Sequence, residues 1–490
     1  MPEFDRRDFL KLVGVGAGAT VATACSDPVE YLIPYVVQPE VITPGIPNYW
    51  ASTCRECPAA CGVHVTTREG RPLKLEGNPD HPVSHGALCG RGQAGLGRTY
   101  HPDRFKGPMA RNAQGELAPV AWNAAISDLA TKIKTAGAGV FVLGADPGPT
   151  ASAQIDAWLA AVGAGGRVVY EPFAPEALRK ATLDVFGIDS QPVFDLSGAD
   201  LVISFGDDLI ETGVSPVEHA RQLATARDVR TRRDGGAHLV YVGPRLSLTA
   251  SNADEWLAAK PGTEGILALA LARIAIAAGK GTAADRAALG ALLDSFDVQS
   301  AATRTGIDAK TIERIGKALA AAKAPVALPP GVALTSRRAT ATASAVLILD
   351  QVIGAVGAGM KIPPADAVGA RHASHREVLA LIDAMKSGNV KVLLVHDADP
   401  LYSLSPATGF AEALAKVPLV VSFASMPDET TTRAHLVLPD HTPAESWGDA
   451  SPRPGIRSIV QPTFRPLYET RALVDTLLDV GRAMGDDVKG

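Results

Sequence analysis

Four cysteines in one short stretch constrain this chain more than any other feature of its sequence. They follow the spacing Cys54-x2-Cys57-x3-Cys61-x27-Cys89, and apart from a fifth cysteine at position 25 the rest of the chain has none. Thiols kept only for packing would be dispersed, so this clustering indicates that the thiols do chemistry. Three thiolates on one tight loop can take three corners of an iron–sulfur cubane, and a distant fourth closes it.

The segment between the third and fourth cysteines has the pattern of a hairpin. Residues 63–67 and 71–76 alternate apolar and polar side chains around Glu69-Gly70, which is typical of two strands joined by a tight turn. A hairpin would bring the fourth cysteine back to the first three. Gly90 and Gly92, beside that fourth cysteine, would give the backbone room to approach the cluster.

Three other uses of these cysteines are weaker. A zinc ribbon normally has two separated Cys-x2-Cys pairs, and the second pair is missing here. Two disulfides would suit an oxidising compartment, but three of the cysteines crowd one loop. Free buried thiols would not cluster. The spacing therefore favours one [4Fe-4S] cluster held by Cys54, Cys57, Cys61 and Cys89.

Composition excludes several functions. The 490 residues are 46% hydrophobic and 20% charged, which is typical of a globular protein of several domains. A net charge of −5 without a basic run argues against nucleic acid as a partner. Aromatic residues make up only 5%, which argues against a carbohydrate or base-stacking surface.

The N-terminus has the pattern of an export signal. Arg6-Arg7 and then Phe9-Leu10-Lys11 precede a short apolar run, as in a twin-arginine signal, although a plain amphipathic helix is the alternative. Small residues before Cys25 resemble a lipidation site; the alternative is a cysteine beside a signal-peptidase site. We therefore expect a periplasmic protein or one at the outer face of the inner membrane, with Cys25 as a lipid anchor. Residues 265–279 are apolar but contain Arg273, which indicates a buried helix rather than a membrane span.

The remainder of the chain alternates short apolar runs with helical patterns. The predicted strands are 140–143, 201–205, 239–242, 392–395 and 419–423. This alternation indicates an α/β fold with doubly wound parallel sheets, whose ligands bind in the loops after the strands.

The cysteine motif, followed by Gly90-Arg91-Gly92, resembles the N-terminal domain of the molybdopterin oxidoreductase family. The resemblance implies an oxidoreductase in which Arg91 lies between the cluster and a pterin; a surface arginine is the alternative. His101-Pro102-Asp103-Arg104, and later Leu438-Pro439 and Glu445-x-Trp447-Gly448, extend the resemblance.

Several loops after predicted strands also resemble this family. The resemblance implies that they contact molybdopterin guanine dinucleotide, and the candidate residues are Gly206, Asp207, Pro244, Arg245, Pro261, Gly262, Thr263, Asp397 and Pro400. Asp207 and Asp397 depart from the family pattern, because carboxylates facing a pyrophosphate are unfavourable without a cation between them.

A second departure concerns the metal ligand. In the family it lies at the start of the inserted domain, which corresponds here to residues 170–187. That stretch has no cysteine or serine, and its acids are Glu171, Glu176 and Asp184. A thiolate ligand to molybdenum is thereby excluded, and an aspartate ligand stays open.

The predicted domains follow from these motifs. They are a twin-arginine signal with a lipidation site, a small β-rich 4Fe-4S domain, an α/β domain in two pieces, an inserted Rossmann-like α/β domain and a C-terminal segment. The respective bounds are 1–25, 46–108, 109–170 plus 371–455, 171–370 and 456–490. The family's C-terminal cofactor domain is not represented, so we expect that a separate chain supplies it or that the pterin site is vestigial.

Both ends of the chain resemble the molybdopterin-like subunit of alternative complex III and related quinone redox complexes. The matching segments are Tyr31-Leu32-Ile33-Pro34-Tyr35, Ile42-Thr43-Pro44-Gly45, Pro452-Arg453-Pro454-Gly455 and Gln461-Pro462. The resemblance implies an electron-transfer subunit of a membrane-associated respiratory complex, without molybdenum. Its partners would be a ferredoxin-like iron–sulfur subunit, a polytopic quinone-interacting membrane subunit and a c-type cytochrome. The alternatives are a true molybdenum enzyme for a small inorganic or organic substrate, completed by a partner chain, and a scaffold subunit without a redox centre.

Overall fold

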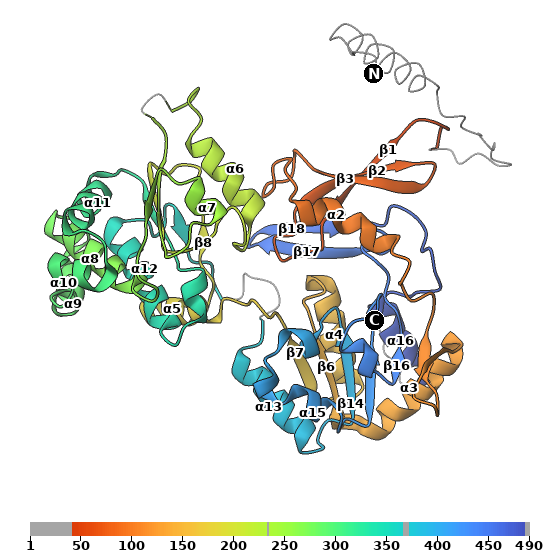
Figure 1. The fold of residues 1–490 in the computed structure, drawn as a ribbon. Coiled ribbons are helices and arrows are strands. Elements are labelled where there is room, and N and C mark those ends of the chain that lie inside the picture. Colours follow the sequence, from red (N-terminus) through yellow and green to blue (C-terminus); the bar gives the residue numbers. More distant parts are fainter. Residues whose placement is uncertain (1–41, 233–234, 366–371, 486–490) are drawn as a thin grey trace, which may run out of the picture.

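The computed structural model describes residues 42–232, 235–365 and 372–485. The predicted export signal, Cys25 and the segment 31–35 lie outside these residues. The described chain forms a small sheet at its start, two α/β units and a long hairpin between them (Figure 1).

The small sheet carries the cysteine motif. Its strands are β1 (Asn48–Thr53), β2 (Gly62–Arg68) and β3 (Arg71–Gly77), and both neighbouring pairs are antiparallel. The predicted hairpin is confirmed: β2 and β3 meet at Glu69 and Gly70, whose φ angles of 53° and 76° make the turn. Helix α2 (Gly90–Thr99) then leads away from the fourth cysteine.

The larger sheet has seven strands in the order β5-β4-β16-β15-β14-β6-β7. The strands are β4 (Met109–Arg111), β5 (Leu117–Pro119), β6 (Val140–Gly144), β7 (Gly166–Val169), β14 (Val392–His396), β15 (Leu419–Ser422) and β16 (Leu436–Val437). The five strands from β16 to β7 run parallel, but β4 and β5 form an antiparallel edge, so the prediction of a parallel sheet holds for five of the seven strands.

Alternating side chains of this sheet pack into two separate hydrophobic cores, one on each face. Val392 and Leu394 face α3 (Trp122–Ala136), α4 (Pro149–Ala161) and α16 (Leu473–Ala483), whereas Leu393 and Val395 face α13 (His375–Lys386) and α15 (Phe410–Leu414). Burial on both faces explains the continuous apolar runs of these strands. The predicted doubly wound arrangement is confirmed.

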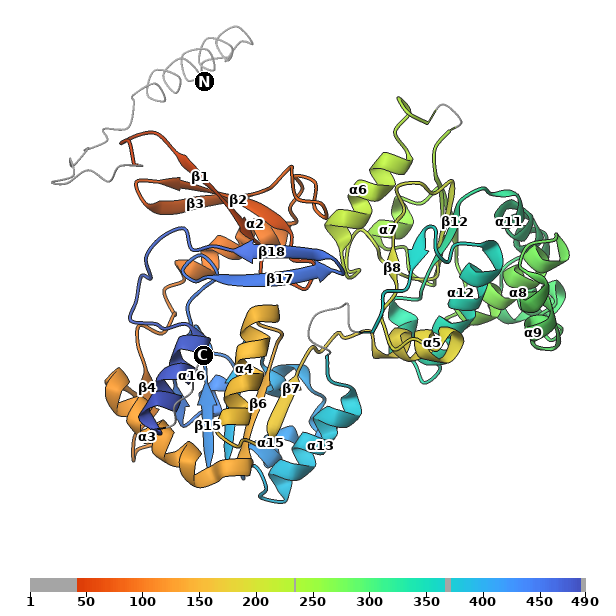
Figure 2. The ribbon, with the colours of Figure 1, turned by 180° about the vertical axis from the view of Figure 1, so that it is seen from behind.

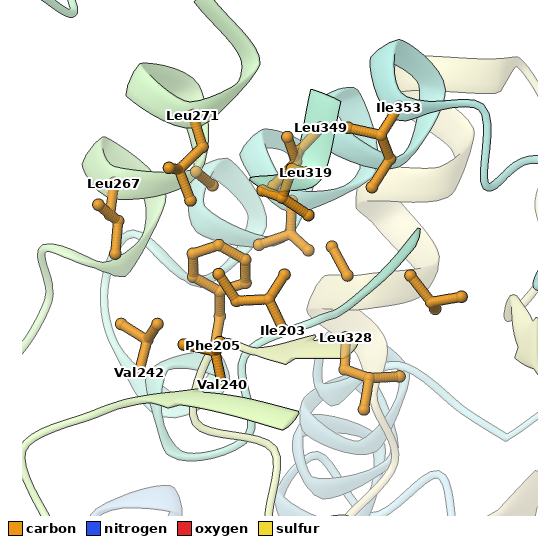
Figure 3. Close-up of a cluster of buried hydrophobic side chains, with 14 of the residues drawn as sticks. Ile203, Phe205, Val240, Val242, Leu267, Leu271, Leu319, Leu328, Leu349 and Ile353 are labelled. Carbon is orange, nitrogen blue, oxygen red and sulfur yellow. The ribbon is translucent and has the colours of Figure 1, made fainter. Parts of the chain in front are cut away.

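The inserted unit has a fully parallel sheet in the order β11-β10-β9-β12. Its strands are β9 (Leu201–Ser204), β10 (His238–Val242), β11 (Glu255–Leu257) and β12 (Pro325–Leu328), and its helices include α5 (Glu176–Phe186), α6 (Pro216–Ala226), α7 (Leu248–Ser251), α8 (Glu264–Ala277), α9 (Ala283–Leu293), α10 (Val298–Thr305), α11 (Ala309–Ala321) and α12 (Ala339–Ile353). Strand residues such as Ile203 and Val240 point at Leu267 and Leu271 of α8 (Figure 3). Helix α8 is therefore the buried helix that was predicted, and no helix in the described part of the chain is long and apolar enough to cross a membrane.

Short elements complete the chain. They are β8 (Val193–Phe194), β13 (Met360–Lys361), α14 (Pro400–Ser403) and the 3-10 turns η1 (Gly137–Gly139), η2 (Val332–Thr335), η3 (Pro406–Thr408) and η4 (Thr431–Arg433). Strands β8 and β13 pair with each other, one at the beginning and one at the end of the inserted unit.

A hairpin from near the end of the chain joins the regions. Strands β17 (Gly448–Arg453) and β18 (Ile456–Val460) lie between the small sheet and the seven-stranded sheet, and the tip of the hairpin reaches α6 (Figures 1 and 2). The predicted domain boundary between residues 455 and 456 cuts this hairpin at its turn. Because the two strands pair, they belong to one structural unit, and α16 packs against α3 and α4 of the larger sheet.

Candidate cluster site and adjoining cavity

The four thiols gather beside the small sheet. Cys54 and Cys61 are buried, Cys57 and Cys89 are half-buried, and all four are free of disulfides. The Cys54 N–H donates to the Cys61 carbonyl (2.8 Å) and the Ala60 N–H donates to the Cys57 carbonyl (3.2 Å), so the first three cysteines share one closed loop. The structure thus brings together the four predicted ligands.

Cys89 lies at the N-cap of α2. Its Sγ accepts a hydrogen bond from the Gly92 N–H (3.4 Å), at the end of the helix where the backbone dipole favours a thiolate. Gly92 also has a packing role. A Cβ there would lie 2.5 Å from Leu88 Cδ1, whereas a Cβ at Gly90 would meet no atom within 4 Å. Gly92 therefore makes room for Leu88, and close packing does not require a glycine at position 90.

The electrostatics of the thiols suit a metal cluster. Burial raises the pKa of Cys54 to about 11 and that of Cys61 to about 12, so both are neutral thiols at pH 7 unless a metal supplies positive charge. In the described residues no three Cys, His, Asp or Glu side chains converge closely enough for a single metal ion. Two buried and two half-buried thiols, on one loop and at one helix N-terminus, can take the four outer corners of a [4Fe-4S] cubane.

A cavity of about 450 Å³ adjoins the cysteine loop. Residues 57–60 of that loop form one part of its wall, the hairpin tip at residues 450–454 forms another, and the inserted unit and the seven-stranded sheet supply the rest. Its lining contains six carboxylates, three arginines and two histidines, namely Glu56, Asp146, Glu171, Asp207, Glu218, Asp397, Arg55, Arg98, Arg453, His219 and His372.

Two of the three arginines form ion pairs inside the cavity. Arg98 on α2 lies 2.9 Å from Asp397 and 3.9 Å from Glu56. The Arg98 guanidinium, with smaller contributions from His396 and Arg55, lowers the pKa of Asp397, whose side chain is 45% exposed. Arg453 at the hairpin tip pairs with Glu218 at the beginning of α6.

The third arginine is held by backbone oxygens. Arg55 donates to the carbonyls of Asp146 (2.7 Å) and Asp449 (3.3 Å). Each arginine in the cavity lining therefore already has an acceptor from the protein. An anionic ligand would have to compete with those acceptors.

Two other groups in the lining have strongly shifted pKa values. Burial, with a smaller contribution from Asp208, raises the pKa of Asp207 to about 7. Burial, with a smaller contribution from Arg453, lowers the pKa of His219 to about 4, so its ring is neutral at pH 7. The Nδ1 atom of His219 is buried and has no hydrogen-bond partner in the described structure.

The three acids of residues 170–187, where the metal ligand was expected, lie in different surroundings. Glu171 lines the cavity and accepts a hydrogen bond from the Phe173 N–H (3.1 Å). Glu176 accepts from the His375 N–H (2.9 Å), and Asp184 pairs with Lys180 on an exposed helix face. An aspartate ligand from this stretch is thereby ruled out, and Glu171 is the acid that faces the cavity.

Only two of the residues predicted to bind the dinucleotide line the cavity, Asp207 and Asp397. Gly206, Pro244, Arg245, Pro261, Gly262 and Thr263 follow β9, β10 and β11, at the carboxyl edge of the inserted sheet. Arg245 is held there by Asp208, and Pro400 is buried at the first turn of α14. Their roles toward a dinucleotide stay predictions.

Arg91 is exposed on the first turn of α2 and does not line the cavity. Arg98 does, and sequence reasoning missed it. The helical spacing could have indicated Arg98, because it lies seven residues after Arg91 and therefore two turns further along the same helix face. Arg55, Glu218, His219 and Arg453 were also missed as cavity residues; no local motif marks them.

Known protein families match nearly the whole described chain. Residues 48–101 match the molybdopterin oxidoreductase Fe4S4 domain, and residues 104–481 match the molybdopterin oxidoreductase domain. These matches support a [4Fe-4S] cluster and a molybdopterin cofactor as the groups of this protein class.

Individual relatives agree with the family match. The chain is similar to a menaquinone reductase, molybdopterin-binding-like subunit of Nitratidesulfovibrio vulgaris, with 29% identity over 99% of this chain and 72% of that protein. It is also similar to the molybdopterin-containing subunit ArrA of the arsenate respiratory reductase of a Shewanella species, with 26% identity over 48% of this chain and 28% of that protein. The solved structure of acetylene hydratase from Pelobacter acetylenicus shares the fold, with a TM-score of 0.71 and 15% identity over 89% of this chain and 69% of that one.

Proposed function

We propose that this chain, which belongs to the molybdopterin oxidoreductase family, is the electron-transfer subunit of a membrane-associated respiratory quinone oxidoreductase. We propose further that it has no functional molybdenum site. Its redox group is the [4Fe-4S] cluster, held by Cys54, Cys57, Cys61 and Cys89. The similarity to a menaquinone reductase subunit supports quinone as the redox partner of the complex.

One observation carries the proposal: every arginine in the cavity lining already has an acceptor from the protein. Arg98 and Arg453 are paired with Asp397 and Glu218, and Arg55 donates to backbone carbonyls. A dinucleotide brings a pyrophosphate, which needs uncommitted cations or N–H groups. The described lining offers no uncommitted arginine or lysine, and its surplus of carboxylates opposes a polyanion.

The missing metal ligand supports the same proposal. Residues 170–187 contain no thiol and no serine hydroxyl, and Glu171 is their single carboxylate in the cavity lining. A thiolate or a serine oxygen from this stretch is therefore unavailable to molybdenum.

The remaining residues suit one-electron transfer. A bound cluster would supply reversible electron uptake, and the protein supplies two buried and two half-buried thiols and the helix terminus beside Cys89. Cys57 lies both in the cluster loop and in the cavity lining, so it is the ligand through which the cluster faces the cavity. The Arg98 guanidinium lies next to Glu56 in the cavity lining, and it offsets negative charge close to the cluster loop.

The export route and the partners belong to this proposal. The arginine pair and Cys25 would direct the folded protein across the membrane and anchor it at the outer face. A ferredoxin-like iron–sulfur subunit, a polytopic quinone-interacting subunit and a c-type cytochrome would complete the electron path.

Metal analysis of the full chain tests the proposal. Anaerobically purified protein should contain about four iron atoms and less than about 0.1 molybdenum or tungsten per chain, whether or not molybdate is added to the growth medium. Stoichiometric molybdenum or tungsten would contradict it. A chain without iron would instead support a scaffold subunit.

One observation favours a second candidate, a molybdenum enzyme completed by a partner chain. The Glu171 carboxylate faces the cavity and could serve as an oxygen ligand. This candidate predicts an extractable pterin, which fluoresces after oxidation, and loss of molybdenum in Glu171→Gln. The leading proposal predicts no pterin and an unchanged metal content in that variant.

A further inference from the structure

The segment that returns the chain to the fourth cysteine is organised around one histidine. Residues 78–87 form a compact loop in which the Asn78 carbonyl accepts from the N–H groups of His81 (3.2 Å) and Gly86 (2.9 Å). The Asn78 N–H in turn donates to the Gly62 carbonyl (2.9 Å), beside Cys61. The loop is therefore fastened next to the third cysteine before it delivers Cys89.

His81 is buried in the middle of this loop. Its Nδ1 faces the N–H groups of Val83 (3.4 Å) and Ser84 (3.3 Å), so Nδ1 accepts hydrogen bonds from both. The proton of the neutral ring therefore lies on Nε2, which donates to Ser458 Oγ at 3.0 Å. One ring thus connects the cysteine-bearing loop to β18 across 377 residues of sequence.

The His81 ring also lies against Gly62, the residue that follows Cys61. A Cβ at Gly62 would come within 2.4 Å of His81 Cγ, so Gly62 leaves the space that the ring fills. Gly62 directly follows Cys61 and begins β2. His81 therefore contacts the chain beside Cys61, carries the loop toward Cys89 and bonds to the hairpin.

We propose that His81 is a positioning residue, which holds Cys89 in place relative to the Cys54–Cys61 loop and ties that arrangement to the β17–β18 hairpin. The inference rests on the cluster and not on the absence of molybdenum. The other strand of the hairpin ends at the cavity through Arg453. The geometry of the cluster site is thereby linked to that of the cavity.

Three substitutions separate the two halves of this role. His81→Ala removes both sets of hydrogen bonds. His81→Asn keeps an acceptor for the loop N–H groups but cannot reach β18. Ser458→Ala removes only the bond to the hairpin. Gln461→Ala is the matched control, because it also deletes a hydrogen bond between the hairpin and the small sheet (Gln461 Nε2 to the Ala51 carbonyl, 2.6 Å) but leaves His81 untouched.

The measurements are the iron content, the electron paramagnetic resonance spectrum of the reduced cluster and the rate at which a chelator removes iron. We expect His81→Ala to shift the g values and to lose iron at least about tenfold faster than wild type. Ser458→Ala and His81→Asn should lose iron about fivefold faster, as for one buried hydrogen bond, and Gln461→Ala at the wild-type rate.

Two results would overturn the inference. If His81→Ala has the spectrum and the iron-loss rate of Gln461→Ala, His81 does not position the cluster. If Ser458→Ala matches wild type in both, the tie to the hairpin does not exist. Should His81→Ala fail to fold, His81→Asn and Ser458→Ala decide the question. A molybdenum-containing protein would refute the proposed function but leave these expectations intact.

Discussion

The cluster site and the adjoining cavity share Cys57, but they differ in whether their polar side chains are paired with other groups of the protein. Four thiols converge beside the small sheet, and burial raises the pKa of Cys54 to about 11 and that of Cys61 to about 12. Across Cys57, the cavity lining brings together six carboxylates and three arginines, and each arginine already has an acceptor from the chain. The variants below test this difference between thiols free of disulfides at the cluster site and paired arginines in the cavity.

The largest expected effect comes from removing a cluster ligand. Cys61→Ala should reduce the iron content from about four atoms per chain to below about one, because three thiolates at this site cannot retain the cubane. The ion pairs of the cavity should persist, since they involve no cysteine. Iron analysis and visible absorbance check this, with Glu171→Gln as the control that alters the cavity alone. Equal iron loss in both variants would erase the distinction between the two regions.

Glu445→Gln should destabilise both regions together. Glu445 and Arg104 form an ion pair (2.7 Å) whose side chains are 0% exposed, and it joins the end of the cluster region to the segment before the hairpin. Breaking a fully buried pair costs about 3–5 kcal/mol, because Arg104 is left buried without its partner. Guanidinium unfolding measures this cost. Glu76→Gln is the control: it breaks an exposed pair with Lys74 and should leave the stability close to that of the wild type.

Arg453→Gln should affect the cavity but not the cluster. It leaves the Glu218 carboxylate, only 5% exposed, without its cation, at a cost of about 2 kcal/mol for a pair that is not completely buried. Thermal unfolding should show the loss while the iron content stays at the wild-type value. Arg457→Gln, which changes an exposed arginine of the same hairpin, should alter neither. A fall in iron with Arg453→Gln alone would show that the cavity supports the cluster.

The last expected effect depends on pH. The folded pKa of Asp207 is about 7, against 3.8 ordinarily, so the folded state holds a proton that the unfolded state releases between these values. Asp207 therefore reduces stability as the pH rises from about 4 to 7. Asp207→Asn should match wild type near pH 4 and be more stable at pH 8. Melting temperatures across this range check it, and parallel profiles for the two proteins would contradict it.

The sequence predicted the fold well where one local pattern determines one element. The Cys54–Cys89 spacing, the hairpin at Glu69-Gly70 and the apolar strands each depend on residues close together in the chain. The cavity was predicted poorly, because its charge balance depends on pairs such as Arg98–Asp397, which are 299 residues apart. The boundary predicted between residues 455 and 456 falls at the turn of the hairpin. Only the pairing of β17 with β18 shows that the two strands form one unit.

The contacts that complete the cluster region also set the timing of its assembly. Arg104 and Glu445 are 341 residues apart, and His81 and Ser458 are 377 apart. At a synthesis rate of about 5–20 residues per second, the N-terminal sheet exists for roughly 20 to 70 seconds before its hairpin leaves the ribosome. During this interval His81 has no serine to bond and Arg104 has no carboxylate. The nascent sheet is thus open to whatever delivers iron and sulfide, and arrival of the hairpin closes it after translation has passed residue 460.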